Sequence, residues 1–249
     1  MCRHLAYIGP PVGLDELLLA PPHSLLQQSY RPRQQRHGTI NADGFGAGWW
    51  QPAIRPEPAR YRTTTPIWAD RSFASLAGTV RTPGVLAAVR SATPPLPVDE
   101  SGCAPFTSGP WLFSHNGAVE GWSAGANVAV RRQVSATRAA AIEGATDSEV
   151  LFALALDRLD DGLGPGAALK AVVAAVAEGP GGRLNLLLSD GTLIAATTWG
   201  DTLSTRSASG AVVVASEPFD DDDTWIPVPD RSLVEARPGQ VAVTPLTRG

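Results

Sequence analysis

The residue with most chemical potential is Cys2, which directly follows the initiator methionine. A side chain of this size permits removal of Met1, and removal would leave a thiol and a free α-amine on one residue. An α-amine has an ordinary pKa near ~7.7–8.0, so part of it is neutral at pH 7 and can take the thiol's proton directly or through a water. Position alone favours an accident of the second codon, so the interpretation of Cys2 as a nucleophile depends on what accompanies it.

A second candidate is Ser114-His-Asn-Gly117, which follows the apolar run Trp111-Leu-Phe113. At the end of a buried strand, the Asn116 amide and the Gly117 N–H can both point at the oxygen that becomes negative in a tetrahedral intermediate. Loss of one such donor typically costs ~10²–10³ in rate. Asn-Gly is also a common tight-turn dipeptide, and this is the competing interpretation.

A third candidate is Val89-Arg-Ser-Ala-Thr93 at the end of another strand-like run. Arg90 can hold a carboxylate through two parallel hydrogen bonds, and the Thr93 hydroxyl can add a third. The alternative is a surface arginine before a proline-rich loop, and for an isolated motif the alternative is favoured.

The fourth candidate, Thr146-Asp-Ser-Glu149, opens a helix. It predicts a capping box in which Thr146 is the N-cap and Glu149 reaches back to it. This leaves the Asp147 side chain free, as an anion at a helix start that can accept hydrogen bonds from a substrate ammonium group.

The spacing of apolar residues, which predicts the elements that position these candidates, changes along the chain. The first half has short apolar runs closed by Gly and Pro, and the middle has apolar residues at helical spacing. Strands are predicted at 2–9, 45–50, 85–90, 111–115, 184–188, 192–198, 211–215 and 240–244, and helices at 14–20, 147–159 and 167–178. Strands on both sides of a helical pair predict a layered α+β domain. Segment 123–146 is the best candidate for a long insertion or a mobile loop, along with the Pro-rich segment 94–110, and whether either acts as a lid is left open.

Composition narrows the function classes. The 249 residues are 43% apolar and 18% charged, which is typical of one globular domain, and the net charge is −4. The chain has no basic stripe, so nucleic acid is not expected as a partner. A small-molecule substrate is expected instead. We expect no membrane span and a cytoplasmic location, since no apolar run approaches ~20 residues. The four histidines lack ligand spacing, so neither a metal nor another cofactor is expected.

The chain resembles the glutaminase domain of the class II glutamine amidotransferases, which are Ntn hydrolases. The resemblance lies in the order and spacing of five features: Cys2, Asn41-Ala-Asp-Gly-Phe-Gly46, Val89-Arg-Ser-Ala-Thr93, His115-Asn-Gly117 and Thr146-Asp-Ser-Glu149. The resemblance implies a four-layer αββα sandwich formed by a single domain, residues 2–249, after removal of Met1. It also implies that Cys2 is the nucleophile, Asn116 and Gly117 form the oxyanion hole, Arg90 and Thr93 bind the α-carboxylate of a γ-glutamyl group, and Asp147 binds its α-amine.

Two departures bear on the substrate. Glutamine-using members carry Trp and His where this chain has Ser91 and Pro94, and no residues remain for a synthase domain. The full length, including Cys2–Gly9 and Ala215–Asp220, resembles a stand-alone branch of ergothioneine biosynthesis that removes glutamate from an adduct of trimethylated histidine. We therefore expect a γ-glutamyl amidohydrolase. The alternatives are a glutaminase subunit that supplies ammonia to a separate synthase, and an inactive scaffold, which has no need of a nucleophile.

A fixed trimethylammonium charge would suit an aromatic or acidic wall. The run Asp220–Asp223 beside Trp225 is one hypothesis for that wall, and a solvated loop is the alternative.

Overall fold

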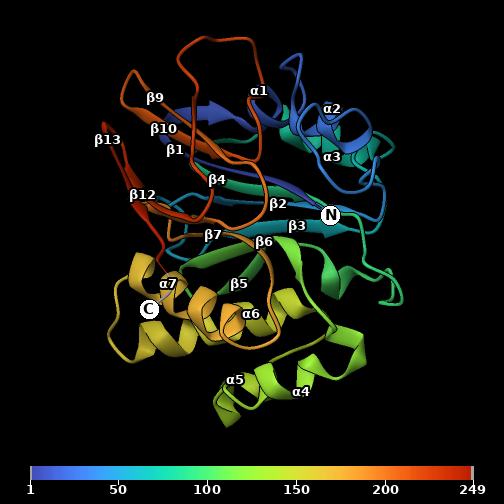
Figure 1. The fold of residues 1–249 in the computed structure, drawn as a ribbon. Coiled ribbons are helices and arrows are strands. Elements are labelled where there is room, and N and C mark those ends of the chain that lie inside the picture. Colours follow the sequence, from blue (N-terminus) through green and yellow to red (C-terminus); the bar gives the residue numbers. More distant parts are fainter. Residues whose placement is uncertain (1, 248–249) are drawn as a thin grey trace.

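The protein consists of two β-sheets packed face to face, with helices on both outer faces (Figure 1). The computed structural model describes residues 2–247. Met1, whose removal is predicted above, lies outside the described residues. The predicted four-layer αββα sandwich is confirmed, because apolar clusters fill each of the three interfaces between layers.

The first sheet is antiparallel throughout and has the strand order β11-β9-β10-β1-β4-β2-β3. Its strands are β1 (Arg3–Gly13), β2 (Phe45–Trp50), β3 (Ala59–Thr63), β4 (Arg81–Val89), β9 (Ser204–Ala208), β10 (Ala211–Ala215) and β11 (Ile226–Pro227). Because β1 is central, Cys2 enters the molecule at the middle of a sheet edge.

The second sheet is also antiparallel and has the order β13-β12-β8-β7-β6-β5. Its strands are β5 (Phe106–Ser108), β6 (Trp111–Val119), β7 (Gly182–Ser189), β8 (Ile194–Thr198), β12 (Ser232–Arg237) and β13 (Gln240–Pro245). Side chains of both sheets, among them Ile8, Leu86, Leu112 and Leu187, form the central core.

Helices α1 (Leu14–Leu18), α2 (Leu25–Tyr30) and α3 (Arg71–Ala77) cover the first sheet, and the second sheet is covered by α6 (Asp147–Asp160) and α7 (Pro165–Ala177). Two shorter helices, α4 (Ala126–Arg131) and α5 (Ala136–Ala140), lie beyond α6 in Figure 1. Short 3₁₀ helices span Glu100–Gly102 and Trp122–Ala124. None of the helices in the described part of the chain is long and apolar enough to cross a membrane.

Most predicted elements are present, with shifted ends. The predicted first strand continues through Pro10-Pro11 to Gly13, and the helix predicted at 14–20 ends at Leu18. The prediction of a loop at 123–146 is wrong, because the segment contains α4 and α5, whose buried Val130 packs in the helix layer. Seven further elements were not predicted, because they are short and lack a clear apolar period: α2, α3, β3, β5, β9, β11 and β12.

Candidate active site

A pocket at one edge of the two sheets brings together residues that are far apart in the sequence. Its walls include Cys2, Arg90, Thr93, Gly117 and Asp147. These come from the start of β1, the end of β4 and the loop after it, the end of β6 and the start of α6. Five of the six predicted site residues therefore line one pocket.

The sixth, Asn116, is fully buried behind the pocket wall, and its side chain is joined to Cys2. The backbone nitrogen of Cys2 donates a hydrogen bond of 3.2 Å to Asn116 Oδ1. The other amide atom, Nδ2, has no hydrogen-bond partner among the described residues. A buried donor without a partner is costly to a fold. This N–H is the side-chain donor that the sequence predicts for an oxyanion.

Gly117 presents a second donor on the same edge of β6. Val119 N–H donates to Asp147 Oδ2 at 2.8 Å, away from β7, and residues two apart in a strand point the same way. The cross-strand partner of Gly117 is Leu184, whose own N–H donates to the carbonyl of Trp199, just after β8, rather than to Gly117. The Gly117 N–H consequently faces the pocket. The competing interpretation of Asn116-Gly117 as a turn is wrong, because β6 continues to Val119.

Only glycine fits at position 117, for a reason of space. A Cβ there would lie 1.9 Å from the carbonyl oxygen of Arg183 on β7. That oxygen belongs to a strand backbone and accepts a hydrogen bond from His115 Nε2 at 2.9 Å, so it cannot easily move.

Arg90 is 5% exposed, which rules out the surface arginine considered above. Its Nη1 donates to the Asp99 carbonyl and its Nη2 to the Pro97 carbonyl, both at 3.1 Å. The guanidinium thus holds the loop after β4 in place while it lines the pocket. Each of these nitrogens carries a second hydrogen, which leaves donors for a carboxylate.

The Asn41–Gly46 segment holds the backbone at Arg90 through hydrogen bonds. Asp43 N–H donates to the Arg90 carbonyl at 2.9 Å, and Asp43 Oδ2 accepts from Ala92 N–H at 2.7 Å. Gly44 has a φ of +112°, and its carbonyl accepts from Arg90 N–H. This sequence motif therefore fixes the backbone on which Arg90 and Thr93 stand.

Asp147 lines the pocket, but the expectation that its carboxylate is free is wrong. Oδ2 accepts from Val119 N–H, and Oδ1 accepts from the N–H of Ser148 at 2.8 Å. The predicted contact between Thr146 and Glu149 is present. Thr146 Oγ1 accepts from Glu149 N–H and donates to Glu149 Oε2 at 3.2 Å, while Glu149 Oε1 accepts from the N–H groups of Glu143 and Gly144. Asp147 is thereby fixed against β6, and its remaining acceptor positions face the pocket.

His115 connects three elements of the site. Its Nε2 lies 2.9 Å from the Arg183 carbonyl and its Nδ1 lies 3.1 Å from Ser148 Oγ. The carbonyl can only accept, so Nε2 carries the proton and Nδ1 accepts from the serine. The ring ties β6 and β7 to the start of α6, which the sequence did not reveal.

The second cysteine does not compete as a nucleophile. Cys103 is fully buried, and burial raises the pKa of its thiol to about 11. Both cysteines are free.

Next to Cys2, Arg3 is completely buried, which the sequence analysis did not anticipate. Its Nε donates to Gln35 Oε1 at 3.2 Å and its Nη1 to Thr202 Oγ1 at 3.3 Å. Burial lowers the pKa of Arg3, against which the negative charges of Glu217 and Asp201 act. Burial also disfavours the charged form of Asp201, and so raises the pKa of its carboxyl group. Arg3, Glu217 and Asp201 therefore form a buried set of charges that begins at the residue directly after the nucleophile candidate.

The Ala215–Asp220 motif holds the polar segment 31–40 at this edge. Buried Glu217 accepts hydrogen bonds from the N–H groups of Arg33 and Gln34, at 2.9 and 2.8 Å. Ser216 Oγ accepts from His4 N–H at 3.0 Å, which ties the same motif to β1.

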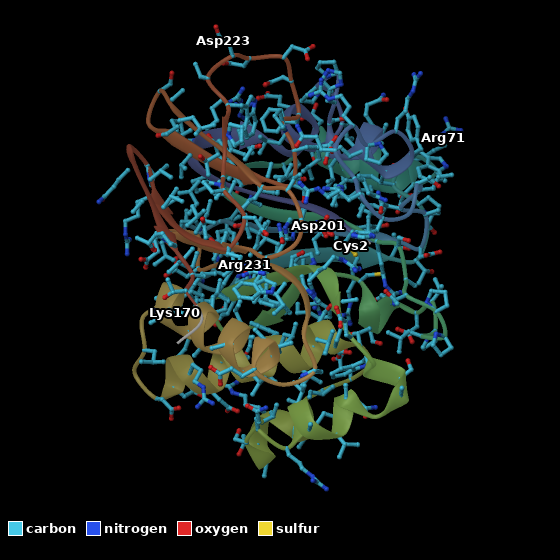
Figure 2. All side chains as sticks on the ribbon, in the orientation of Figure 1. Cys2, Arg71, Lys170, Asp201, Asp223 and Arg231 are labelled. Atoms are coloured by element: carbon cyan, nitrogen blue, oxygen red, sulfur yellow. The ribbon has the colours of Figure 1, made fainter. Side chains whose placement is uncertain are left out.

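The hypothesis that Asp220–Asp223 and Trp225 form an open wall for a cation is not supported. Arg206 lies over the rings of Phe219 and Trp225, with its guanidinium carbon 4.9 and 4.8 Å from the ring centroids. Its Nη1 also contacts both carboxylate oxygens of Asp220. This aromatic face is occupied by the protein's own cation, and Figure 2 places Asp223 well away from Cys2.

As a whole, the arrangement contains the parts of a thiol-dependent acyl transfer site. A thiol stands beside its own backbone nitrogen, the unpaired Asn116 Nδ2 and the Gly117 N–H come from neighbouring residues of β6, and a guanidinium and a carboxylate line the same pocket. Nucleophile, oxyanion donors and a charged recognition site are what such chemistry requires.

Comparison with known proteins gives a consistent result. Residues 23–208 match the family model described as "Glutamine amidotransferases class-II". The gamma-glutamyl-hercynylcysteine sulfoxide hydrolase of Mycolicibacterium smegmatis is 47% identical over 247 residues, which are 99% of this chain and 100% of that protein. The protein of the same name from Mycobacterium tuberculosis (strain CDC 1551 / Oshkosh) is 44% identical, over 100% of this chain and 98% of its own length.

Among solved structures, a glutamine aminotransferase class-II domain protein from Silicibacter pomeroyi superposes with a TM-score of 0.72. It is 26% identical and covers 99% of this chain and 100% of its own. The glutamine phosphoribosylpyrophosphate amidotransferase of B. subtilis gives 0.69 at 17% identity, over 100% of this chain and 50% of its own, and shows the fold alone.

Proposed function

The chain belongs to the class II glutamine amidotransferases, and from this membership and its site we propose that it hydrolyses the γ-glutamyl amide bond of γ-glutamyl-hercynylcysteine sulfoxide. The products are glutamate and hercynylcysteine sulfoxide, and the reaction is a step of ergothioneine biosynthesis. The observation that carries this proposal is the match to hydrolases of that name at 44–47% identity over essentially the full length of both chains. The site geometry supports it with a suitable nucleophile.

The reaction begins once Met1 has been removed, so that Cys2 carries a free α-amine. The amine takes the thiol's proton, directly or through a water, and Sγ attacks the γ-carbonyl carbon of the substrate. The carbonyl oxygen becomes an oxyanion that accepts hydrogen bonds from Asn116 Nδ2 and Gly117 N–H. The bond from Cys2 N to Asn116 Oδ1 orients the Asn116 amide so that Nδ2 faces the oxyanion.

Collapse of this intermediate breaks the C–N bond, and the α-ammonium of Cys2 returns a proton to the departing amine. The glutamyl group is left as a thioester on Cys2 Sγ. Water then attacks the thioester carbon, its proton passes to the α-amine, and the same two donors hold the second oxyanion. Glutamate leaves and the thiol is restored, so atoms and protons balance over the cycle.

The glutamyl group is recognised by charge. Arg90 and Thr93 bind its α-carboxylate, and the Asp147 carboxylate accepts from its α-ammonium. Because Val119 N–H and Ser148 N–H already fix Asp147, its oxygens present their remaining lone pairs in one orientation. A group lacking either α-substituent would leave a buried charge unpaired, which selects for γ-linked glutamate.

We place the reaction in the cytoplasm, carried out by residues 2–249 as a single domain. The net charge of −4 gives no electrostatic footprint for nucleic acid.

The test is glutamate release from γ-glutamyl-hercynylcysteine sulfoxide and from glutamine, measured in parallel for the wild type, Cys2→Ala and Cys103→Ala. We expect release from the sulfoxide that Cys2→Ala abolishes and Cys103→Ala retains, since the Cys103 thiol is buried and remains protonated. Intact mass of the active protein should lack the first methionine.

Preference for glutamine would refute the substrate and favour the alternative, a glutaminase subunit of a separate synthase. Activity that persists in Cys2→Ala, or in a protein whose mass retains Met1, would refute the mechanism.

A further inference from the structure

A second recess opens at the same sheet edge as the proposed oxyanion donors, and we propose that it binds the betaine end of the leaving group, a trimethylammonium beside a carboxylate. The recess is lined by Glu120, Trp199, Asp230 and Arg231 together with the backbone around Gly181, Gly182 and Gly200, and has a volume of about 350 Å³. This inference rests on the proposed function for the identity of the ligand.

The recess is placed to receive the far end of a substrate whose amide lies at Cys2. Glu120 follows the end of β6, four residues beyond Asn116, so it lies roughly 13 Å along the strand direction at most. Gly182 and Gly200 flank Arg183, whose carbonyl oxygen lies directly behind Gly117. Arg183 Nε is also 3.6 Å from Asp201 Oδ2, one residue beyond Gly200 of the recess. We infer that an extended cysteine sulfoxide joined to a histidine reaches from Cys2 to this recess.

The chemistry of the lining suits a zwitterion. Trp199 supplies an aromatic face, which attracts quaternary ammonium groups, and Glu120 and Asp230 supply negative charge. Arg231 supplies a cation for the carboxylate. A trimethylammonium group cannot donate a hydrogen bond, so a π face and nearby negative charge attract it instead of hydrogen-bond acceptors. The Gly200 N–H donates to Asp230 Oδ1 at 2.8 Å, which positions this negative charge in the recess.

A cation already occupies the aromatic face. The guanidinium carbon of Arg231 lies 5.1 Å from the centroid of the Trp199 ring. Arg231 is one of two non-glycine residues of the described chain with a left-handed backbone, at φ +55°. A non-glycine residue in this conformation is sparsely populated and is held only where the surroundings impose it. Arg231 is also exposed, so its side chain can turn from the ring to a ligand carboxylate as the trimethylammonium takes its place.

The contact between Arg206 and Trp225 differs from the contact between Arg231 and Trp199. The Arg206 guanidinium is held by two contacts to Asp220 and lies between two aromatic rings, so it is fixed in place. No ion pair between Arg231 and a carboxylate occurs within the described residues. Trp225 is therefore the matched control for Trp199.

The experiment titrates the protein with the amine product, hercynylcysteine sulfoxide, and with its counterpart made from unmethylated histidine, by calorimetry. For wild type we expect tighter binding of the trimethylated compound. Trp199→Leu, Glu120→Gln and Arg231→Gln should each weaken it about five- to thirtyfold, whereas Trp225→Leu should leave it unchanged. Glu120 and Arg231 are exposed, so these two variants test the recess even if Trp199→Leu folds poorly.

Equal affinity for both compounds, or unchanged affinity in Glu120→Gln and Arg231→Gln, would overturn the inference. Hydrolysis by wild type is measured separately. If the sulfoxide substrate is cleaved while the recess variants bind normally, the recess assignment fails and the proposed function stands. If the product binds with the expected sensitivity but no substrate is cleaved, the recess stands and the proposed function fails.

Discussion

Asn116 and Asn185 are direct cross-strand neighbours on β6 and β7, both are fully buried, and they allow one sharp prediction. Asn116 has an unpaired Nδ2. Asn185 is fully bonded, since Nδ2 donates to the carbonyls of Asp201 and Thr202 and Oδ1 accepts from the N–H groups of Trp199 and Asp201. The same substitution by alanine should therefore have opposite consequences at the two positions.

In Asn116→Ala, stability changes little. The variant loses one hydrogen bond to the Cys2 nitrogen, about 0.5–1.5 kcal/mol, but it also removes a buried unpaired donor that costs about 1–3 kcal/mol. Catalysis loses an oxyanion donor, and kcat should fall about 10²–10³-fold. In Asn185→Ala, four hydrogen bonds disappear and buried backbone groups lose their partners. We expect a loss of about 2–4 kcal/mol, or a Tm lower by roughly 5–15 °C at this chain length.

The assay pairs calorimetric melting of both variants with single-turnover glutamate release, scaled to the folded fraction. The reasoning about Asn116 would be refuted if its alanine variant melted as low as Asn185→Ala, or if it kept wild-type kcat. Asn116→Asp provides a check on charge: it retains size but places a carboxylate against the oxyanion, so it should be no more active than the alanine variant.

Three further predictions concern the surroundings of the site. Gly117→Ala should reduce kcat by at least about 10²-fold, measured as glutamate release, because its Cβ would lie 1.9 Å from the Arg183 carbonyl oxygen and must displace the proposed oxyanion donor. Burial, with the nearby positive charge of Arg3, lowers the pKa of His4 from 6.5 to about 3, so the stability due to its neutral form is complete above pH 6.5 and is lost as pH falls towards 3. The free energy of unfolding changes by about 1.4 kcal/mol per pH unit in this range, so urea unfolding should show about 2 kcal/mol less stability at pH 5 than at pH 6.5. His4→Gln should make the free energy of unfolding less dependent on pH. Equal pH dependence in the wild type and His4→Gln would contradict this reasoning. Glu217→Gln should release segment 31–40 and speed its cleavage by trypsin, and an unchanged digestion rate would show that the two bonds do not anchor it.

The sequence was informative wherever local chemistry or periodicity carries the signal. The helical spacing over 147–159 predicted α6 almost to the residue, and the apolar run before Ser114 located β6. Elements shorter than about two turns, or strands with polar residues such as Ser204–Ala208, escaped notice because they are stabilised by neighbours rather than by their own pattern. The loop predicted at 123–146 failed for the same reason, since α4 and α5 depend on packing beside α6.

By itself, the sequence determined the kind of chemistry and the family. The order of an N-terminal cysteine, an Asn-Gly pair after an apolar run, an arginine and a helix-start aspartate predicts a nucleophile, oxyanion donors and charged recognition groups. Their side-chain types set what each can donate or accept.

Only the tertiary structure decided which of these groups are available. Sequence could not show that Asn116 Nδ2 is unpaired while Asn185 is saturated, that Asp147 is held by Val119 N–H, or that Arg231 covers Trp199. Each of these depends on strand register or on loops that meet from distant parts of the chain. Hydrogen bonds and burial are properties of such meetings, and a one-dimensional pattern does not contain the distances on which they depend.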